Sequence, residues 1–253
     1  MKKFIFILFF FYSIEINGRE FGQTEITAED GVEVFQDERY YLLKKNVQIE
    51  SDNFILSGNL IKIYFDKDLY DIKIIDAKGD VNLNSNLHNI IAKGEELYFI
   101  IDEEKIMING INSYLATDSI KMFSDEKIHV NNTNGDFNLF GDNSSIKTKD
   151  ILVKGKEIYG VFEPNSNIND ISLLTVEDKK IAYVMSNDTE MFANKIKYNK
   201  KTSVIELEEN VKIIDQGEVV TGDFGSINTN TNSYKIKSKE SKRVKVIISE
   251  NNE

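Results

Sequence analysis

The sequence predicts an all-β protein, an elongated, twisted β-jelly roll or slab of tandem antiparallel hairpins. Three observations predict it: apolar residues alternate with polar ones almost throughout, short Asn-, Asp- and Gly-rich segments separate the alternating runs, and two short phrases recur along the chain. Alternation places successive side chains on opposite faces of a strand. Runs spaced about 8 to 12 residues apart predict roughly 14 to 16 strands, with one short helical turn around Ala28 to Gly31.

Two recurring phrases indicate how the strands are organised. LEENVKII, Leu207 to Ile214, is similar to LKKNVQIE, Leu43 to Glu50, and copies of this first phrase begin at residues 43, 77, 107, 133, 167 and 207. A second phrase sets small or turn-prone residues before an apolar run, and its copies begin at residues 55, 90, 113, 151, 191 and 219. Hairpins that cannot bury their apolar face alone must stack. Six hairpin repeats therefore predict two stacked sheets, apolar faces inward, with free sheet edges at both ends.

Alternation also predicts which side chains point inward. In the run LIKIYFD, Ile61, Ile63 and Phe65 share one face, while Tyr64 falls on the other. The same rule, applied along the chain, gives the full inward set: Val47, Ile49, Ile61, Ile63, Phe65, Val81, Leu83, Leu97, Phe99, Ile101, Ile120, Met122, Phe137, Leu139, Val211 and Ile213.

Composition narrows the classes of partner. The chain has 253 residues and 41% apolar content, enough for one sizeable core. Its formal net charge of −11 argues against a nucleic-acid partner and disfavours binding to anionic membrane surfaces. It contains no cysteine, which excludes disulfides and thiolate zinc sites.

The N-terminus has the composition of an export signal. Met1 to Lys3 is basic, and the eleven residues from Phe4 to Ile14 are apolar or nearly so. A helix needs about 20 residues to cross a bilayer, so residues 1–18 are interpreted as a signal peptide cut after Gly18. The alternative is a retained anchor. Residues 19–238 then form one domain, and residues 239–253 are a charged tail or a last strand. Export without cysteine suits a bacterial periplasm.

Several short motifs resemble the OstA-like, LptA family. Ile26-Thr27-Ala28-Glu29 precedes Asn46-Val47-Gln48-Ile49, and later Ala92-Lys93-Gly94 is followed by Leu97-Tyr98 and Ala193 by Ile196-Lys197-Tyr198. The chain departs from the family pattern at Glu29, where the family has Asp, and at Lys45, where it has Gly. The resemblance covers about residues 24 to 238.

The resemblance implies lipopolysaccharide transport in outer-membrane biogenesis of a Gram-negative envelope. A periplasmic protein of this family would shield the acyl chains of lipid A in an apolar groove made by the inward set. It would bridge an LptC-like inner-membrane protein and an LptD-like outer-membrane translocon, docking β edges head to tail as a homo-oligomer. The docking edges expected here are Thr24, Ile26, Val32 and Val34 at one end, and Val219, Phe224, Ile227, Tyr234 and Ile236 at the other.

The sequence contains no pattern typical of catalysis. His88 and His129 are its only histidines, and it has no G-x-S-x-G and no Walker A motif. We therefore expect no enzyme activity, no cofactor and no metal. Four alternatives remain. Two belong to the same pathway: an LptC-like membrane-anchored component and a detached N-terminal domain of the translocon. The other two are a structural β-solenoid with a closed core and no lipid ligand, and a polysaccharide-active enzyme, which would need convergent carboxylates.

Overall fold

The computed structural model describes residues 19–67, 71–87, 89–163, 170–239 and 243–248. Within these ranges the chain forms eighteen strands in one antiparallel sheet, and no described residue is helical. The predicted all-β class is therefore confirmed. The predicted signal segment, residues 1–18, lies outside the described residues. No helix in the described part of the chain is long and apolar enough to span a membrane.

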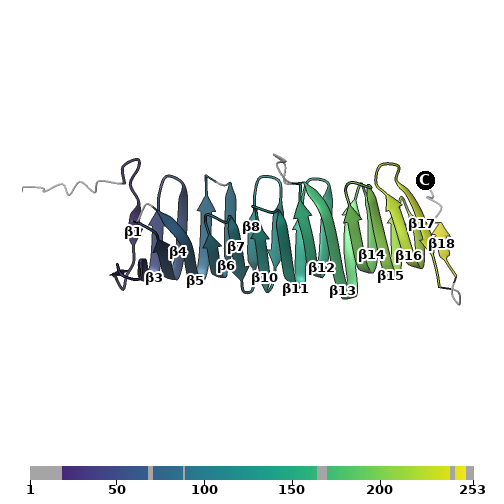
Figure 1. Cartoon of the computed structure of the whole chain (residues 1–253). Coiled ribbons are helices and arrows are strands. Elements are labelled where there is room, and N and C mark those ends of the chain that lie inside the picture. The colour runs from purple at the N-terminus through teal and green to yellow at the C-terminus, as the bar shows by residue number, and fades with distance from the viewer. Residues whose placement is uncertain (1–18, 68–70, 88, 164–169, 240–242, 249–253) are drawn as a thin grey trace, which may run out of the picture.

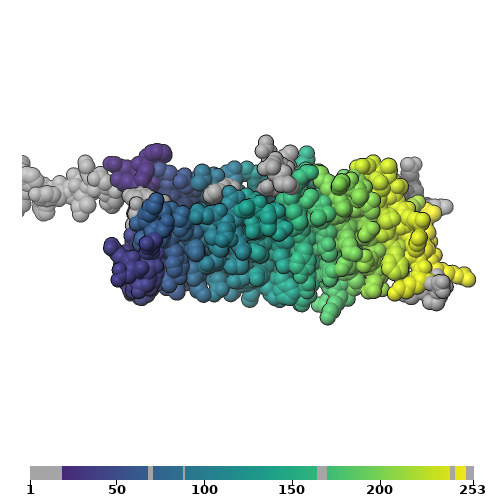
Figure 2. Space-filling view, viewed as in Figure 1, coloured from purple at the N-terminus to yellow at the C-terminus, as the bar shows by residue number. Residues whose placement is uncertain are grey.

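The strands follow one another along the body in chain order, from β1 at one end to β18 at the other (Figure 1). Figure 2 shows the same order as successive bands of colour across the surface. Their bounds are β1 Glu25–Thr27, β2 Val32–Phe35, β3 Tyr40–Glu50, β4 Phe54–Phe65, β5 Ile72–Ser85, β6 Ile90–Ile100, β7 Lys105–Asn109, β8 Ser113–Ala116, β9 Lys121–Ser124, β10 Lys127–Asn131, β11 Asp136–Lys147, β12 Ile151–Phe162, β13 Ile171–Ser186, β14 Thr189–Asn199, β15 Val204–Asp215, β16 Glu218–Asn228, β17 Ser233–Lys237 and β18 Lys245–Ile248.

Eight of the short strands are halves of longer ones. β1 and β2 both pair with β3, and β7 and β8 both pair with β6. Likewise β9 and β10 both pair with β11, and β17 and β18 both pair with β16. Joining these four pairs leaves 18 − 4 = 14 long crossings among the described strands. Each crossing runs antiparallel to its neighbours, so the body is a ladder of hairpins.

Each long crossing is interrupted near its middle, along a line that we call the crease. In β3 the register with β4 shifts between Lys44 and Val47, so two residues oppose one on the partner strand, which is a β-bulge. Similar shifts interrupt β5 and β15. The bulged residues have positive φ angles: Lys45, Asn46, Gly79, Asp80, Glu209 and Asn210. Asn, Asp and Gly adopt this conformation at low cost, which explains the recurring Asn or Asp of the first phrase.

The crease divides the sheet into two walls. Wall A contains β2, β7, β10, β17 and the halves of the other strands aligned with them. Its outer limit, rim A, includes the turns at 36–39, 101–104, 132–135, 200–203 and 229–232. Wall B contains β1, β8, β9, β18 and the remaining halves, and its rim B includes the turns at 51–53, 117–120, 148–150, 187–188 and 216–217. Buried apolar side chains from both walls form a single cluster between them.

The second phrase carries a small residue where the walls converge. Four glycines pair with the residues next to the crease: Gly58, Gly94, Gly155 and Gly222. Ala193 takes the corresponding place on β14. A Cβ on Gly155 would lie 2.5 Å from Cγ1 of the buried Val176. Close approach of the two walls therefore explains the small residue of this phrase.

Not every copy of the first phrase occupies the same place. The copies that begin at Leu43, Ala77 and Leu207 lie across the crease. The copy at Thr133 instead forms a turn of rim A, where Gly135 has φ +80°. On that crossing the crease falls at Gly141, eight residues past Thr133, where the β11–β12 register shifts. Turn and crease both favour Asn, Asp and Gly, so the sequence pattern does not separate them.

The helical turn expected at Ala28 to Gly31 is wrong. These residues form the first bend of the crease, between β1 and β2, and Gly31 has φ +104°. The backbone N–H of Glu29 donates to the carbonyl of Lys45 at 2.9 Å, and that of Asp30 to Lys44 at 3.1 Å. Pairing of both flanking strands with β3 overrides the local preference.

Candidate functional site

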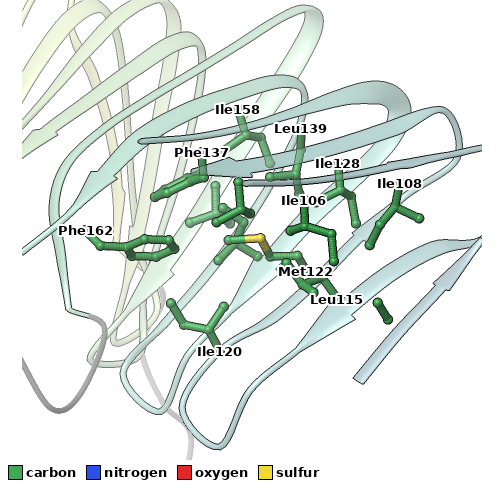
Figure 3. Close-up of a cluster of buried hydrophobic side chains, with 14 of the residues drawn as sticks. Ile106, Ile108, Leu115, Ile120, Met122, Ile128, Phe137, Leu139, Ile158 and Phe162 are labelled. Carbon is green, nitrogen blue, oxygen red and sulfur yellow. The ribbon is translucent and has the colours of Figure 1, made fainter. Parts of the chain in front are cut away.

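The space between the walls is filled mainly by buried apolar side chains. Figure 3 shows side chains from two parts of the sheet projecting toward one another. Ile106 and Phe137 come from wall A, and Leu115 and Met122 come from wall B. In β7 and β9 buried and less buried residues alternate, so the buried side chains of each strand share one face.

A first cavity of about 260 Å³ lies within this space, between the rims. Its apolar lining comes from both walls: Phe99, Ile106, Val130 and Phe162 from wall A, and Ile90, Leu115, Ile120 and Met122 on the wall B side. Glu104, Thr117 and Asn132 border it at the rims. Asn132 donates to the Glu104 carboxylate at 2.5 Å, which holds two turns of rim A together.

A second cavity of about 760 Å³ continues along the same line toward the C-terminal end. Ile120 and Ile151 border it from wall B, and Ile171 and Ile205 from wall A. Lys200 lies at its edge and bonds to the carboxylates of Glu163 at 2.5 Å and Asp170 at 2.9 Å. The hydrogen bond to Glu163, followed by that to Asp170, raises the pKa of Lys200, so this lysine stays charged and fixed to rim A.

The structure places most of the inward set in the closed core. Fourteen of these sixteen side chains are buried, and Phe65 and Ile101 are half-buried at rim A. Only Phe99, Ile120 and Met122 line the first cavity. The remaining buried members are Val47, Ile49, Ile61, Ile63, Val81, Leu83, Leu97, Phe137, Leu139, Val211 and Ile213.

Sequence reasoning missed several cavity residues. Five residues line the first cavity but are absent from the predicted inward set: Ile90, Ile106, Leu115, Val130 and Phe162. All five lie in alternating runs, so a stricter use of alternation would have found them.

Apolar side chains also face the interior at both ends of the slab. Val32 and Val34 are 46% and 47% exposed, and their partners across the strand pair, Leu43 and Tyr41, pack in the core. At the other end Val246 is 54% exposed although its partner Val220 is buried. The interior is therefore uncovered at each terminal strand.

The predicted docking residues divide between edge and interior. Ile26 lies on β1, and Val32 and Val34 on β2, all on the first crossing, and Thr24 directly precedes β1. Tyr234 and Ile236 lie on β17, part of the last crossing. The other three lie on β16, whose outer side is paired with β17 and β18, so they are one crossing inside the edge: Val219, Phe224 and Ile227.

One side-chain hydrogen bond links the two rims at the C-terminal end. The Tyr234 hydroxyl donates to the Glu218 carboxylate at 3.2 Å, joining wall A to rim B. Burial, and then this hydrogen bond, raises the pKa of Tyr234.

The described acidic and histidine side chains were compared with the arrangement that a metal ion requires. Within the described ranges no three His, Asp or Glu side chains are placed to hold a metal ion. His129 lies half-buried on the outer face of β10, and its Nε2 atom is buried without a hydrogen-bond partner. Burial lowers the pKa of His129, and the nearby Lys105 and Lys127 lower it further. His88 lies outside the described residues.

The fold and site together define an antiparallel β-slab of two walls, with an apolar interior that opens between the rims and at both ends. No protein-family model matches the chain, and no curated protein matches its sequence. A solved structure similar to this chain is that of LptH, described as the LptA-homologous periplasmic component of the lipopolysaccharide transport device of Pseudomonas aeruginosa. The identity is 15%, the match covers 52% of this chain and 95% of LptH, and the TM-score is 0.43. A similarity of this strength assigns neither a family nor an activity.

Proposed function

We propose that the protein is a periplasmic carrier that shields the acyl chains of lipopolysaccharide between its two walls. The observation that carries the proposal is the position of the two cavities, between the rims and lined by inward apolar side chains. An acyl chain gains about 0.8 kcal/mol for each CH₂ removed from water. A polar head group attached to it can stay in water at the rims. Residues 1–18 would direct export.

The cavity volumes suit part of a lipid in the present conformation. Small-molecule sites span roughly 300 to 1,000 Å³, and the two cavities measure about 260 and 760 Å³. A lipid with several chains needs more room, so the rims must part on loading. The crease supplies a hinge for this motion, because separating the rims does not require the hydrogen bonds within either wall to break.

Photocrosslinking tests the proposal. A benzophenone amino acid at Phe99 or Ile120, in the exported full-length protein, should crosslink to lipopolysaccharide. Tyr98 is a matched control because it neighbours Phe99 on the opposite face of β6. Ile49 is a second control, because it is fully buried away from both cavities. A folded protein that crosslinks at none of these sites, or equally well at Tyr98, would contradict an open lipid groove and favour a structural β-solenoid.

We further propose that copies stack head to tail through the first and last crossings. In wall A, β2 runs from the crease to rim A, whereas β17 runs from rim A to the crease. In wall B, β1 runs from rim B to the crease, whereas β18 runs from the crease to rim B. With an even number of crossings, the first crossing of one copy can therefore continue the antiparallel ladder beyond the last crossing of another in both walls. The same edges would meet an LptC-like and an LptD-like partner.

The charges on the two edges are complementary. In wall A, Glu33 is exposed on β2 of the first crossing, although it also bonds to Lys44 at 2.5 Å. Lys235 and Lys237 project from β17. Opposite charges at facing edges favour correctly oriented pairing and disfavour like ends meeting.

A charge-exchange experiment tests the stacking. In wall A, Glu33→Lys makes both edges basic, and Lys235→Glu with Lys237→Glu makes both edges acidic. Each variant alone should sediment as a monomer at a concentration where the unaltered protein forms oligomers. An equal mixture of the two variants should recover oligomers, because both junctions are then complementary. Stacking by either variant alone, or a mixture that stays monomeric, would contradict the proposed junction.

A further inference from the structure

The outer faces of the two walls carry different charge. From β6 to β18, the outward residues of wall B are those that alternate with buried ones, as Lys121 does with Ile120 and Met122. Among the described residues at these outward positions there is one carboxylate, Glu190. There are six lysines: Lys93, Lys121, Lys147, Lys154, Lys212 and Lys245. We call this surface the cationic face.

Aromatic rings lie among these lysines. Tyr183 and Phe192 are opposite one another on β13 and β14, with ring centroids 5.1 Å apart. The Nζ atom of Lys154 lies 5.7 Å from the Tyr183 ring, and that of Lys212 lies 5.3 Å from the Phe192 ring. On β8 and β9, Tyr114 and Phe123 form a similar outward pair. The cationic face is thus apolar and basic at once.

The lysines of the cationic face are not held by salt bridges. None of the six forms a salt bridge with any carboxylate in the described part of the chain. On wall A, by contrast, Lys78 bonds to Glu96 at 3.1 Å and Lys197 to Glu208 at 2.7 Å.

Two of these lysines even oppose each other. Lys121 on β9 and Lys147 on β11 are direct cross-strand partners. Like charges in this position are unfavourable within the folded protein. This opposed pair, on a face whose other four lysines also form no salt bridge, points to an external anionic partner.

We propose that the cationic face docks on the surface of an anionic phospholipid bilayer. Lysine is depleted at protein–protein interfaces, whereas lysines beside a bilayer gain attraction to anionic head groups. Tyrosine rings favour the interfacial layer, and lysine stems lie along apolar surface while their ammonium groups reach the phosphates. The inference does not depend on what the interior binds. It describes where the protein rests rather than what it carries.

Vesicle sedimentation with matched variants tests the docking. Vesicles of phosphatidylethanolamine with about one quarter phosphatidylglycerol should bind the full-length protein, and binding should weaken as salt shortens the Debye length from about 30 to about 8 Å. Lys121→Gln with Lys147→Gln should weaken binding about 25-fold, since each lysine near such a surface contributes roughly fivefold. Lys105→Gln with Lys127→Gln is the control, because it removes the same charge from the outer face of wall A in the neighbouring strands.

A fluorescent label tests the orientation without depending on residues 1–18. The chain has no cysteine, so Ser145→Cys and Ser226→Cys each give a single labelling site. Ser145 lies on the cationic face between Phe123 and Lys154, and Ser226 lies on the outer face of wall A. An environment-sensitive dye should shift to the blue on these vesicles at Ser145 only. Equal weakening by the two lysine pairs, equal dye shifts at both sites, or binding to an acidic protein but not to vesicles would overturn the proposal.

Discussion

The convergence of the walls at the crease can be tested at Gly155. An added Cβ would lie 2.5 Å from Val176 Cγ1, and the next nearest atom is Ala182 Cβ at 3.7 Å. Ordinary contacts begin near 3.4 Å, so a single methyl group carries the whole overlap. Overpacking of this kind costs about 1 to 3 kcal/mol. Gly155→Ala should therefore destabilise the protein by that amount.

Removal of the opposing methyl group should reverse the sign of this effect. Val176→Ala alone deletes two buried methyl groups, at about 0.8 kcal/mol each, and leaves a cavity that adds about 1 kcal/mol. It should cost about 2.5 kcal/mol. In the Val176→Ala background no neighbour remains within the overlap distance. Gly155→Ala should then stabilise by about 0.4 to 1 kcal/mol, because alanine restricts the unfolded chain more than glycine does.

Urea unfolding measures all four proteins of this cycle. Circular dichroism at the β-sheet minimum is the signal, because the chain has no tryptophan. The expected result is a free energy of unfolding for the double variant at or slightly above that of Val176→Ala. If Gly155→Ala cost the same in both backgrounds, the overlap with Val176 would not be its cause, and the account of the crease would be refuted.

Three further perturbations follow from the outer faces and the rims. His129 has a lowered pKa in the folded state, so the unfolded chain binds more protons as pH falls through about 6.5, and the free energy of unfolding should decline there. His129→Gln should flatten this decline when stability is measured by urea unfolding at several pH values. An NMR titration of the His129 ring with its midpoint at or above about 6.5 would contradict the lowered pKa. Lys147→Glu should stabilise by about 0.2 to 1 kcal/mol, because it faces Lys121 across the strands; an unchanged urea midpoint would argue against the repulsion. Tyr234→Phe should cost up to about 1 kcal/mol through its hydrogen bond to Glu218, and no loss of thermal stability would mean that this link between the rims contributes nothing.

The sequence predicted well on which face of a strand a side chain lies, but it did not predict which side chains line a cavity. Alternation depends only on neighbouring residues, so it placed side chains such as Ile61 and Leu139 inward, and both are fully buried. It could not distinguish closed core from cavity wall. Phe162 and Met122 line one cavity from opposite walls, and their meeting depends on how the sheet folds at the crease.

The net charge of the chain likewise did not predict how charged side chains are distributed over its surface. A net charge of −11 argued against anionic membranes. The structure distributes that charge unevenly, because carboxylates such as Asp80 and Glu209 lie at the crease and Glu104 lies at a rim, while lysines alternate with buried residues on wall B. The sum over a chain does not describe one of its faces.

The sequence by itself determined the elements: alternating runs made strands, and Asn, Asp and Gly at recurring positions made the turns and the crease. Both signals are local, since they depend on residue spacing and on which residues adopt positive φ angles at low cost. The tertiary structure alone decided where the cavities lie, which strands are edges and which wall is basic. Those features depend on pairs of residues from separate crossings, and their distance is set only when the sheet folds into two walls.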